Sequence, residues 1–373
     1  MIYLDNAATT FPKPPEVIEA VRRCIEKYGG NPGRGAHPLA LAAAEQIYSC
    51  REALCDLLGA PSPERVLFTQ NTTYALNLAL KGLLHRGDHV LISELEHNAV
   101  RRPICRLAAD GMISFDTFPV VGLADDEITA AIRAALRPNT RAVVCTHASN
   151  VCSITLPLLA IGTLCRQHGL YFMVDAAQSA GVYPIHMESM HIDALAAPGH
   201  KALYGIQGCG TLLLGKGITL DTLIEGGSGI HSLDDNMPVD PPERYEAGTL
   251  PTPAIAGLLA GIQTLQGEME SIARHESALF VALKERLETL PAYCIYAPTH
   301  AGSTLLFNHR RLNATALGKH LSDQGFCVRT GLHCAPLAHR ALNTPESGAV
   351  RVSFGRYNTV SDVDALWRAL KFD

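Results

Sequence analysis

The stretches RAVVCT (141–146) and YFMVDAAQ (171–178) decide the fold class of this chain. Each begins as a continuous apolar run rich in β-branched and aromatic residues, and a helical pattern over 158–168 separates the two. Strands that are apolar on both faces and joined by amphipathic helices are typical of a mainly parallel sheet covered on both sides. We therefore predict an α/β fold.

The same alternation extends outward in both directions from these two stretches. Strands are predicted at 66–69, 89–92, 113–118, 194–197 and 211–214, and helices at 73–84, 98–109 and 126–136. From residue 254 the pattern changes to α+β, with long helices over 254–290, strands at 304–307 and 350–354, and a last helix over 361–370. We predict a large domain over 15–253 and a smaller one formed by 1–14 and 254–373. Residues 226–253 are rich in Gly, Pro and Asp, which predicts a long functional loop.

Composition narrows the class of protein. The 373 residues are 47% hydrophobic and 18% charged, which is enough for a large core, and the net charge is -5. A nucleic-acid-binding face would require a basic excess, so no nucleic-acid partner is expected. The N-terminus shows no secretory pattern and no apolar run reaches the length of a membrane span, so we expect a cytoplasmic protein without a membrane partner.

The eleven cysteines show no regular spacing. The close pairs Cys50/Cys55 and Cys145/Cys152 are not CxxC pairs, which argues against a zinc or dithiol site. Most of them are expected to be reduced and buried, because free cysteine packs as a small hydrophobe. One could still serve as a nucleophile in a cytoplasmic enzyme.

A carboxylate and a lysine follow two neighbouring predicted strands. Asp175 ends the run at 171–175, where ligands of open parallel sheets bind, although an Asp there could simply cap the next helix. Lys201 follows in APGHK, before Gly205, Gly208 and Gly210. An apolar, glycine-rich setting lowers the pKa of a lysine, which suits Schiff-base formation; most lysines, by contrast, lie on the surface. Together the two supply the pyridinium partner and the Schiff-base lysine that pyridoxal 5'-phosphate (PLP) requires.

Two weaker signals agree with a phosphate-bearing ring. Thr72 and Thr73 open the helix at 73–84, and free N–H groups at a helix N-terminus bind phosphate, although Thr72 could be a plain N-cap. His97 follows the strand at 89–92 and could stack on a flat ring or handle protons, although a lone histidine is more often structural.

Cys334 stands out among the cysteines. It lies in VRTGLHCAP (328–336), a polar segment with His333 beside it and Arg329 nearby, which favours a thiolate. A structural or metal-binding role is the alternative. His333, Cys334 and His339 lack a matching second pair of ligands, so we predict no metal site.

At this point the chain resembles the class V aminotransferase-fold enzymes, and more narrowly the cysteine desulfurases and selenocysteine lyases. The resemblance runs from about Tyr3 to Asp364. It rests on ordered motifs: YLDNAATT, GNPGRGAH, NTTYALN, EHNA, HASNV, VDAAQSAG, GHKALYG, YEAGT, RTGLHCAP and VRVSFGRYNT. It implies the PLP-dependent transferase fold of type I.

The resemblance also implies a role for each matching residue. Lys201 would hold PLP covalently, Asp175 would pair with the pyridine nitrogen, Gln178 would reach the phenolic oxygen and His97 would stack on the ring. Thr72, Thr73 and His200 would bind the phosphate, with Thr249 contributing from a neighbouring subunit. Arg351 would clamp the substrate carboxylate, with Arg329 and Asn150 at the substrate. Lys201, His97 and Cys334 would be catalytic, Cys334 taking the sulfur as a persulfide. Pro198 stands where relatives often carry a phosphate-binding serine.

The hypothesis that follows is that the chain is a PLP-dependent cysteine desulfurase, which converts L-cysteine to L-alanine. The alternatives are a selenocysteine lyase acting on L-selenocysteine, another PLP C–S lyase, or an aminotransferase on the same fold. A degenerate, non-enzymatic scaffold would be expected to lose Asp175 or Lys201, and both are present. The resemblance further implies a homodimer and a sulfur-acceptor protein as partners.

Overall fold

The computed structural model describes residues 1–33, 35–296 and 298–372. Within them, seven strands form one mixed sheet in the order β2-β8-β7-β6-β5-β3-β4. The strands are β2 (Val66–Thr69), β3 (Asp88–Ser93), β4 (Ile113–Phe118), β5 (Thr140–Thr146), β6 (Tyr171–Asp175), β7 (Ala194–Pro198) and β8 (Gly210–Leu214). Only β8 runs antiparallel to its neighbours among these strands, so the prediction of a mainly parallel α/β sheet is confirmed.

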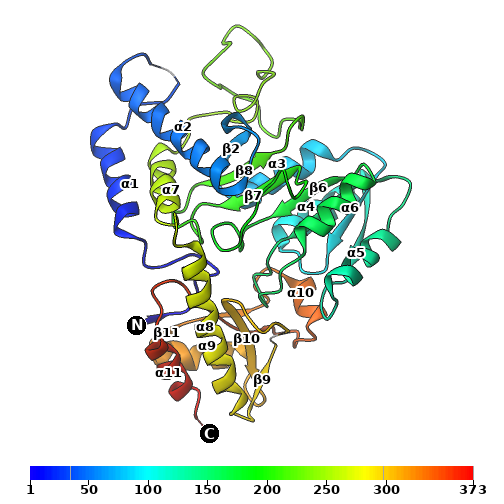
Figure 1. The fold of residues 1–373 in the computed structure, drawn as a ribbon, viewed down its shortest axis with the longest axis vertical. Coiled ribbons are helices and arrows are strands. Elements are labelled where there is room, and N and C mark those ends of the chain that lie inside the picture. The colour runs from blue at the N-terminus through cyan, green and yellow to red at the C-terminus, as the bar shows by residue number, and fades with distance from the viewer. Residues whose placement is uncertain (34, 297, 373) are drawn as a thin grey trace.

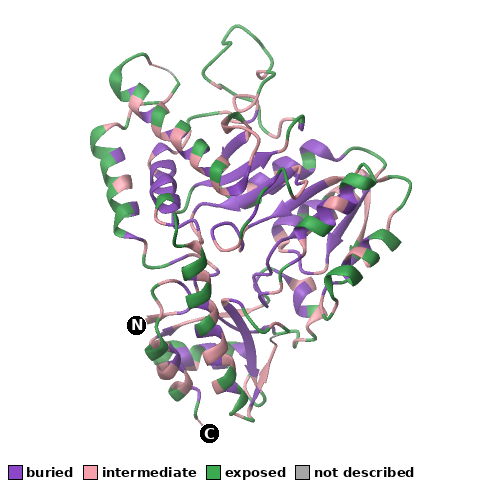
Figure 2. Ribbon diagram, viewed as in Figure 1, coloured by how far each residue is buried: buried purple, intermediate pink, exposed green. Residues whose placement is uncertain are grey.

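Helices cover both faces of this sheet because its strands are apolar on both sides. In β6, Phe172 and Val174 join one core cluster, whereas Met173 between them joins another. The first cluster includes buried side chains of α1 (Pro15–Lys27), α2 (Pro38–Leu58), α5 (Asp125–Ala134), α6 (Leu158–Gln167) and α7 (Thr252–Gln263). The second is built with α3 (Thr72–Leu83) and α4 (Asn98–Ala109). Figure 2 shows the buried strands in purple between partly exposed helices.

A second, antiparallel sheet lies apart from the large one (Figure 1). Its order is β12-β13-β10-β9, from β9 (Tyr293–Ile295), β10 (Thr304–His309), β12 (Arg329–Gly331) and β13 (Ala349–Ser353). A third core cluster packs it against α8 (Met269–Glu288), α9 (Ala314–Asp323) and α11 (Val360–Ala369). Leu4 of the N-terminal segment also lies in this cluster, and β1 (Ile2–Tyr3) pairs in parallel with β11 (Phe326–Cys327).

The division into two domains stays a prediction. The packing of α7 suggests a different boundary between them. This helix packs closely on α1 and α2, and its buried residues Ile255 and Leu258 belong to the core of the large sheet. We therefore propose that the boundary lies after α7, at 264–268, rather than at residue 253. Of the long loop predicted over 226–253, residues 226–251 contain no helix or strand, whereas 252 and 253 already belong to α7. None of the helices that the structure describes combines the length and apolar character of a membrane span.

Candidate active site

A cavity opens where β5, β6 and β7 end, the edge at which parallel sheets bind ligands. Thr146, Asp175 and Pro198, the last residues of these strands, all lie in its wall. The fold thereby brings together residues far apart in the chain. The lining consists of Asn71, Thr72, Thr73, His97, Ala99, Thr146, Asn150, Asp175, Ala177, Gln178, Pro198, His200 and Lys201.

Asp175 is the buried carboxylate of this cavity. Its Oδ1 accepts a hydrogen bond from the Ala177 N–H at 2.9 Å, and its main-chain oxygen accepts one from the His147 N–H. Burial raises the pKa of Asp175, whereas the Ala177 N–H and the charge of Lys201 lower it. A cation bound in the cavity, in addition to Lys201, would lower the pKa of Asp175 further and hold its carboxylate ionised. Gln178 lies beside it and donates from Nε2 to the Ala7 carbonyl at 2.9 Å.

Lys201 follows β7 in a loop that continues into a turn, with the Tyr204 N–H donating to the Lys201 carbonyl. Burial lowers the pKa of Lys201 to about 8; the charge of Asp175 raises it, and that of Arg351 lowers it further. An amine with this pKa is partly neutral near physiological pH. It can therefore act as a nucleophile or exchange a proton.

The N-terminal segment anchors this loop, which sequence reasoning did not anticipate. Thr9 Oγ1 and Lys13 Nζ donate to the His200 carbonyl at 3.0 and 2.6 Å, and Thr10 Oγ1 donates to the Lys201 carbonyl at 3.0 Å. These partners are 187 to 191 residues away in the chain. No local sequence pattern could have revealed them.

The N-terminus of α3 forms another part of the wall. Asn71 is its N-cap and accepts from the Tyr74 N–H at 2.9 Å, so Asn71, not Thr72, caps the helix. Thr72 Oγ1 and His200 Nδ1 are both buried, and neither has a hydrogen-bond partner in the described part of the chain. Gly210, the first residue of β8, allows this strand to approach the N-terminus of α3 closely, because a Cβ there would collide with the Asn71 backbone. Unpartnered donors beside a helix N-terminus make this corner suitable for an anion.

His97 and Glu96 lie where β3 leads into α4. His97 Nδ1 accepts from the Ala99 N–H at 3.0 Å, so its neutral ring carries the proton on Nε2. Burial lowers the pKa of His97 to about 4, with Lys201 acting in the same direction. Glu96 was not predicted as part of the site. Its Oε1 accepts from Ser93 Oγ and from the Thr146 N–H, and burial raises its pKa to about 8.

Arg351 approaches from β13 and is fully buried. Its Nη2 forms an ion pair with Asp5 at 2.6 Å, and its Nη1 donates to the Asn150 carbonyl at 2.9 Å. Its Nε has no partner within residues 1–33, 35–296 and 298–372, and burial lowers the pKa of Arg351. Arg351 therefore lies beside Asn150, a residue of the cavity wall, although it does not itself line the cavity.

Cys334 lies on a loop that contacts the same wall. Asn150 Nδ2 donates to the His333 carbonyl at 2.8 Å, and the Asn98 N–H donates to the Cys334 carbonyl at 2.7 Å. Arg329 Nη2 is 3.6 Å from Cys334 Sγ. Of the cysteines in the described part of the chain, Cys334 alone is exposed.

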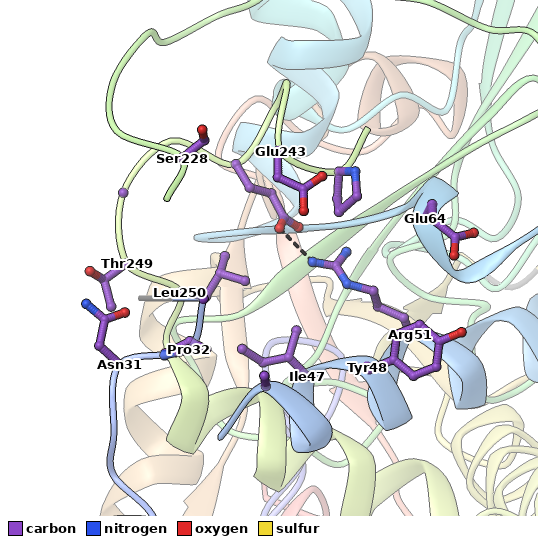
Figure 3. Close-up of a pocket in the computed structure, with 15 residues that line it drawn as sticks. Asn31, Pro32, Ile47, Tyr48, Arg51, Glu64, Ser228, Glu243, Thr249 and Leu250 are labelled. Carbon is purple, nitrogen blue, oxygen red and sulfur yellow. Dashed lines mark hydrogen bonds and ion pairs between the residues drawn. The ribbon is translucent and has the colours of Figure 1, made fainter. Parts of the chain in front are cut away.

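Thr249 is the predicted site residue that lies elsewhere. It borders a separate cavity of about 400 Å³ between α2 and the stretch 226–250. There it lies with Asn31 on one side, whereas Arg51 lies on the other (Figure 3). Arg51 forms a buried ion pair with Glu246 at 2.6 Å.

Comparisons with known proteins find similar chains of one family. Residues 2–366 match the family described as aminotransferase class-V. A probable cysteine desulfurase of Methanothermobacter thermautotrophicus is 31% identical, with 99% of this chain and 94% of the relative aligned. A cysteine desulfurase of Yersinia pestis is also 31% identical, over 100% of this chain and 93% of the relative.

Solved structures of two cysteine desulfurases share the fold. The apo enzyme of Thermococcus onnurineus superposes with a TM-score of 0.89 at 30% identity, covering 99% of this chain and 94% of that one. CsdA of Escherichia coli gives the same TM-score at 27% identity, covering 99% and 93%. The fold predicted from the sequence, that of the type I PLP enzymes, is confirmed by these superpositions.

Proposed function

This chain belongs to the aminotransferase class-V family, and on that premise we propose that it is a PLP-dependent cysteine desulfurase. The reaction would convert L-cysteine to L-alanine and leave the sulfur as a persulfide on Cys334. The observation that carries the proposal is the position of Cys334. Its exposed thiol lies 3.6 Å from Arg329 Nη2, on a loop bonded to Asn98 and to Asn150 of the cavity wall.

The residues of the cavity fit PLP. Thr72 Oγ1, at the N-terminus of α3, and His200 Nδ1 are buried without partners among the described residues, and a phosphate would satisfy them. Thr73 lines the same cavity. Asp175 is a buried carboxylate suited to a protonated ring nitrogen, and Lys201 has the pKa of a nucleophilic amine. His97 and Gln178 complete the set that would hold the ring. When bound, PLP supplies an electron sink that stabilises negative charge on the substrate.

The chain's own residues would carry out the proton transfers and sulfur transfer. Lys201, with its pKa near 8, would remove the proton from the substrate α-carbon. The Cys334 thiolate would then attack the substrate sulfur, so that an S–S bond forms and the Cβ–S bond breaks. The electron pair of the broken bond stays on the substrate, whose Cβ takes up a proton and becomes the methyl group of alanine. Lys201 would then return a proton to the α-carbon. A cysteine side chain suits the attack on sulfur because it is intrinsically very nucleophilic.

Arg351, Arg329 and Asn150 would bind the substrate. Arg351 contacts Asn150 of the cavity wall and Arg329 contacts Cys334, and these guanidinium groups would hold a carboxylate by charge-assisted hydrogen bonds. The Arg351 Nε has no partner among the residues that the structure describes, and its Nη2 already binds the carboxylate of Asp5. A substrate carboxylate would therefore use Nε or share Nη2 with Asp5.

Thr249 would act in a homodimer. It borders a cavity other than the one that holds Lys201, so its predicted contact with the phosphate would be made in a neighbouring subunit. Sedimentation analysis tests this arrangement. A monomer that retains full activity would overturn it.

The proposed function is tested by alanine release from L-cysteine and from L-selenocysteine, measured side by side with PLP present. Cys334→Ala is expected to abolish release from L-cysteine and to spare release from L-selenocysteine, because selenium leaves readily without a thiol acceptor. Cys294→Ala, which removes a half-buried cysteine of β9, is the matched control and should leave both rates unchanged.

Equal loss with both substrates in Cys334→Ala would contradict the persulfide role. Wild type that releases alanine only from L-selenocysteine would identify a selenocysteine lyase. If it releases none from either substrate, both assignments fail, and another PLP C–S lyase or an aminotransferase becomes the working hypothesis.

A further inference from the structure

Two histidine rings stack directly behind the Cys334 loop. The planes of His333 and His339 are 14° apart with centroids 5.2 Å apart, and His333 Nδ1 lies 2.9 Å from His339 Nε2. Both side chains are buried. The chain of contacts continues at each end, to the Arg329 carbonyl on one side and to Thr344 Oγ1 on the other.

The chemistry of the two ends fixes the direction of every hydrogen bond. The Arg329 carbonyl, 3.3 Å from His333 Nε2, can only accept, so Nε2 carries the proton of a neutral His333. His333 Nδ1 is then an acceptor, and His339 Nε2–H donates to it. His339 Nδ1 must in turn accept from the Thr344 hydroxyl at 2.8 Å. Burial lowers the pKa of His333 to about 3 and that of His339 to about 4, with Arg351 acting in the same direction, so both rings are neutral at pH 7.

This chain of directed hydrogen bonds supports a strained stretch of backbone at His333 and Cys334. His333 and Cys334 have φ values of 50° and 57°, in the left-handed region that non-glycine residues rarely adopt. Consecutive residues in this region persist only where the surroundings hold them there. Asn150 and Asn98 bind the two main-chain carbonyls, and His339 binds the His333 side chain. The loop is thereby held from both sides.

We propose that His339, supported by Thr344, is a positioning residue that fixes the His333 ring and so holds Cys334 against the wall of the active-site cavity. The inference rests on the proposed function, because it assigns His339 an effect on the step that uses the thiol. His339 lies in α10 (Pro336–Ala341), behind the loop, and does not line the cavity. Its effect on the reaction would be transmitted through His333.

The test compares three substitutions in the PLP-loaded enzyme. His339→Leu keeps apolar bulk but removes the donor to His333, whereas His339→Gln keeps an N–H near the position of Nε2. Thr344→Val removes only the hydroxyl. For L-cysteine we expect His339→Leu to lower kcat by roughly tenfold to a hundredfold with KM little changed, since small misplacements of a reacting group cost this much. Turnover of L-selenocysteine should be spared, His339→Gln should restore most of the kcat, and Thr344→Val should be intermediate.

A second readout follows the loop itself and needs no substrate. Amide hydrogen exchange of a peptide spanning 328–344 should accelerate in His339→Leu and return toward the wild-type rate in His339→Gln, with melting temperatures measured for each variant. An equal loss of turnover with both substrates, or unchanged exchange in His339→Leu, would overturn the proposal. If wild type releases no alanine, the proposed function fails, and the exchange rates still decide whether His339 holds the loop.

Discussion

Arg351 Nη1 donates a hydrogen bond to the main-chain oxygen of Asn150 at 2.9 Å. This contact joins the antiparallel sheet, which carries Arg351 in β13, to a residue of the cavity wall. The Asn150 side chain also binds the His333 carbonyl. One residue therefore connects the proposed carboxylate clamp with the loop that carries Cys334.

Replacing Arg351 with lysine should weaken substrate binding. An ammonium group cannot make the planar two-point contact of a guanidinium. We expect the KM for L-cysteine to rise about tenfold or more, with a smaller change in kcat, because one charge-assisted hydrogen bond contributes roughly 1.5–3 kcal/mol. Steady-state kinetics checks this expectation. The control is Arg356→Lys, because the Arg356 guanidinium lies over the Tyr204 ring. A change in kcat alone would argue against a binding role.

Lys201 should be the lysine that PLP modifies. Borohydride reduction of the PLP-loaded protein, followed by peptide mass analysis, should label Lys201 and leave Lys13 unlabelled. Lys13 is an informative comparison, because burial also lowers its pKa to about 8 and its Nζ binds the His200 carbonyl. Lys201→Ala should lose the label and lower alanine release by roughly a thousandfold or more. A label on Lys13 in the wild type would contradict the assignment.

Glu96 should make folding stability dependent on pH. Burial raises its folded pKa from 4.5 to about 8, so its contribution to stability is fully present below pH 4.5 and is lost as the pH rises through about 8. Glu96→Gln stays neutral and keeps acceptors for Ser93 and Thr146. The melting temperature of the variant relative to wild type should therefore increase between pH 5 and pH 9. A difference that is constant over this range would show that Glu96 does not titrate there.

Gly261 should be intolerant of a side chain. It lies in α7, and a Cβ there would overlap the main-chain oxygen of Leu203, in the turn that follows Lys201. Gly261→Ala should therefore destabilise the protein by about 1–3 kcal/mol and weaken PLP retention. Gly257→Ala in the same helix is the control, because its Cβ would lie 2.7 Å from a Val21 methyl group and no closer than 3.9 Å to a main-chain atom outside its own helix, so a side chain rather than the main chain would have to shift. Chemical unfolding and PLP titration measure the two effects.

The sequence was most informative where burial acts on both faces of a strand. The predictions at 66–69 and 171–175 coincide with β2 and β6, because these runs are apolar and short. The helix α2 was missed, although its buried residues recur at helical spacing: Ala40, Ala43, Ile47, Cys50, Leu54 and Leu58. The first two are small, and the exposed Leu39 and Leu41 beside them weaken the contrast between the apolar and polar faces.

The residues of the candidate site also differ in how well the sequence predicts them. Residues that end strands or begin helices, such as Asp175 and Thr72, could be identified from their place in a local pattern. Asp5 and Thr10 could not, because they act through main-chain groups and an ion pair with residues from the far part of the chain. Glu96 was passed over in favour of its neighbour His97, since only the three-dimensional packing shows it to be fully buried.

The N-terminal segment has a consequence for the order of folding. Asp5 pairs with Arg351 across 346 residues of chain, and β1 pairs with β11. The N-terminal segment therefore reaches these partners only after the chain has been made as far as Arg351, and closing so long a loop is slow. Because the same segment anchors the carbonyls of His200 and Lys201, we expect the loop at the cofactor cavity to be completed late, after the large sheet has formed.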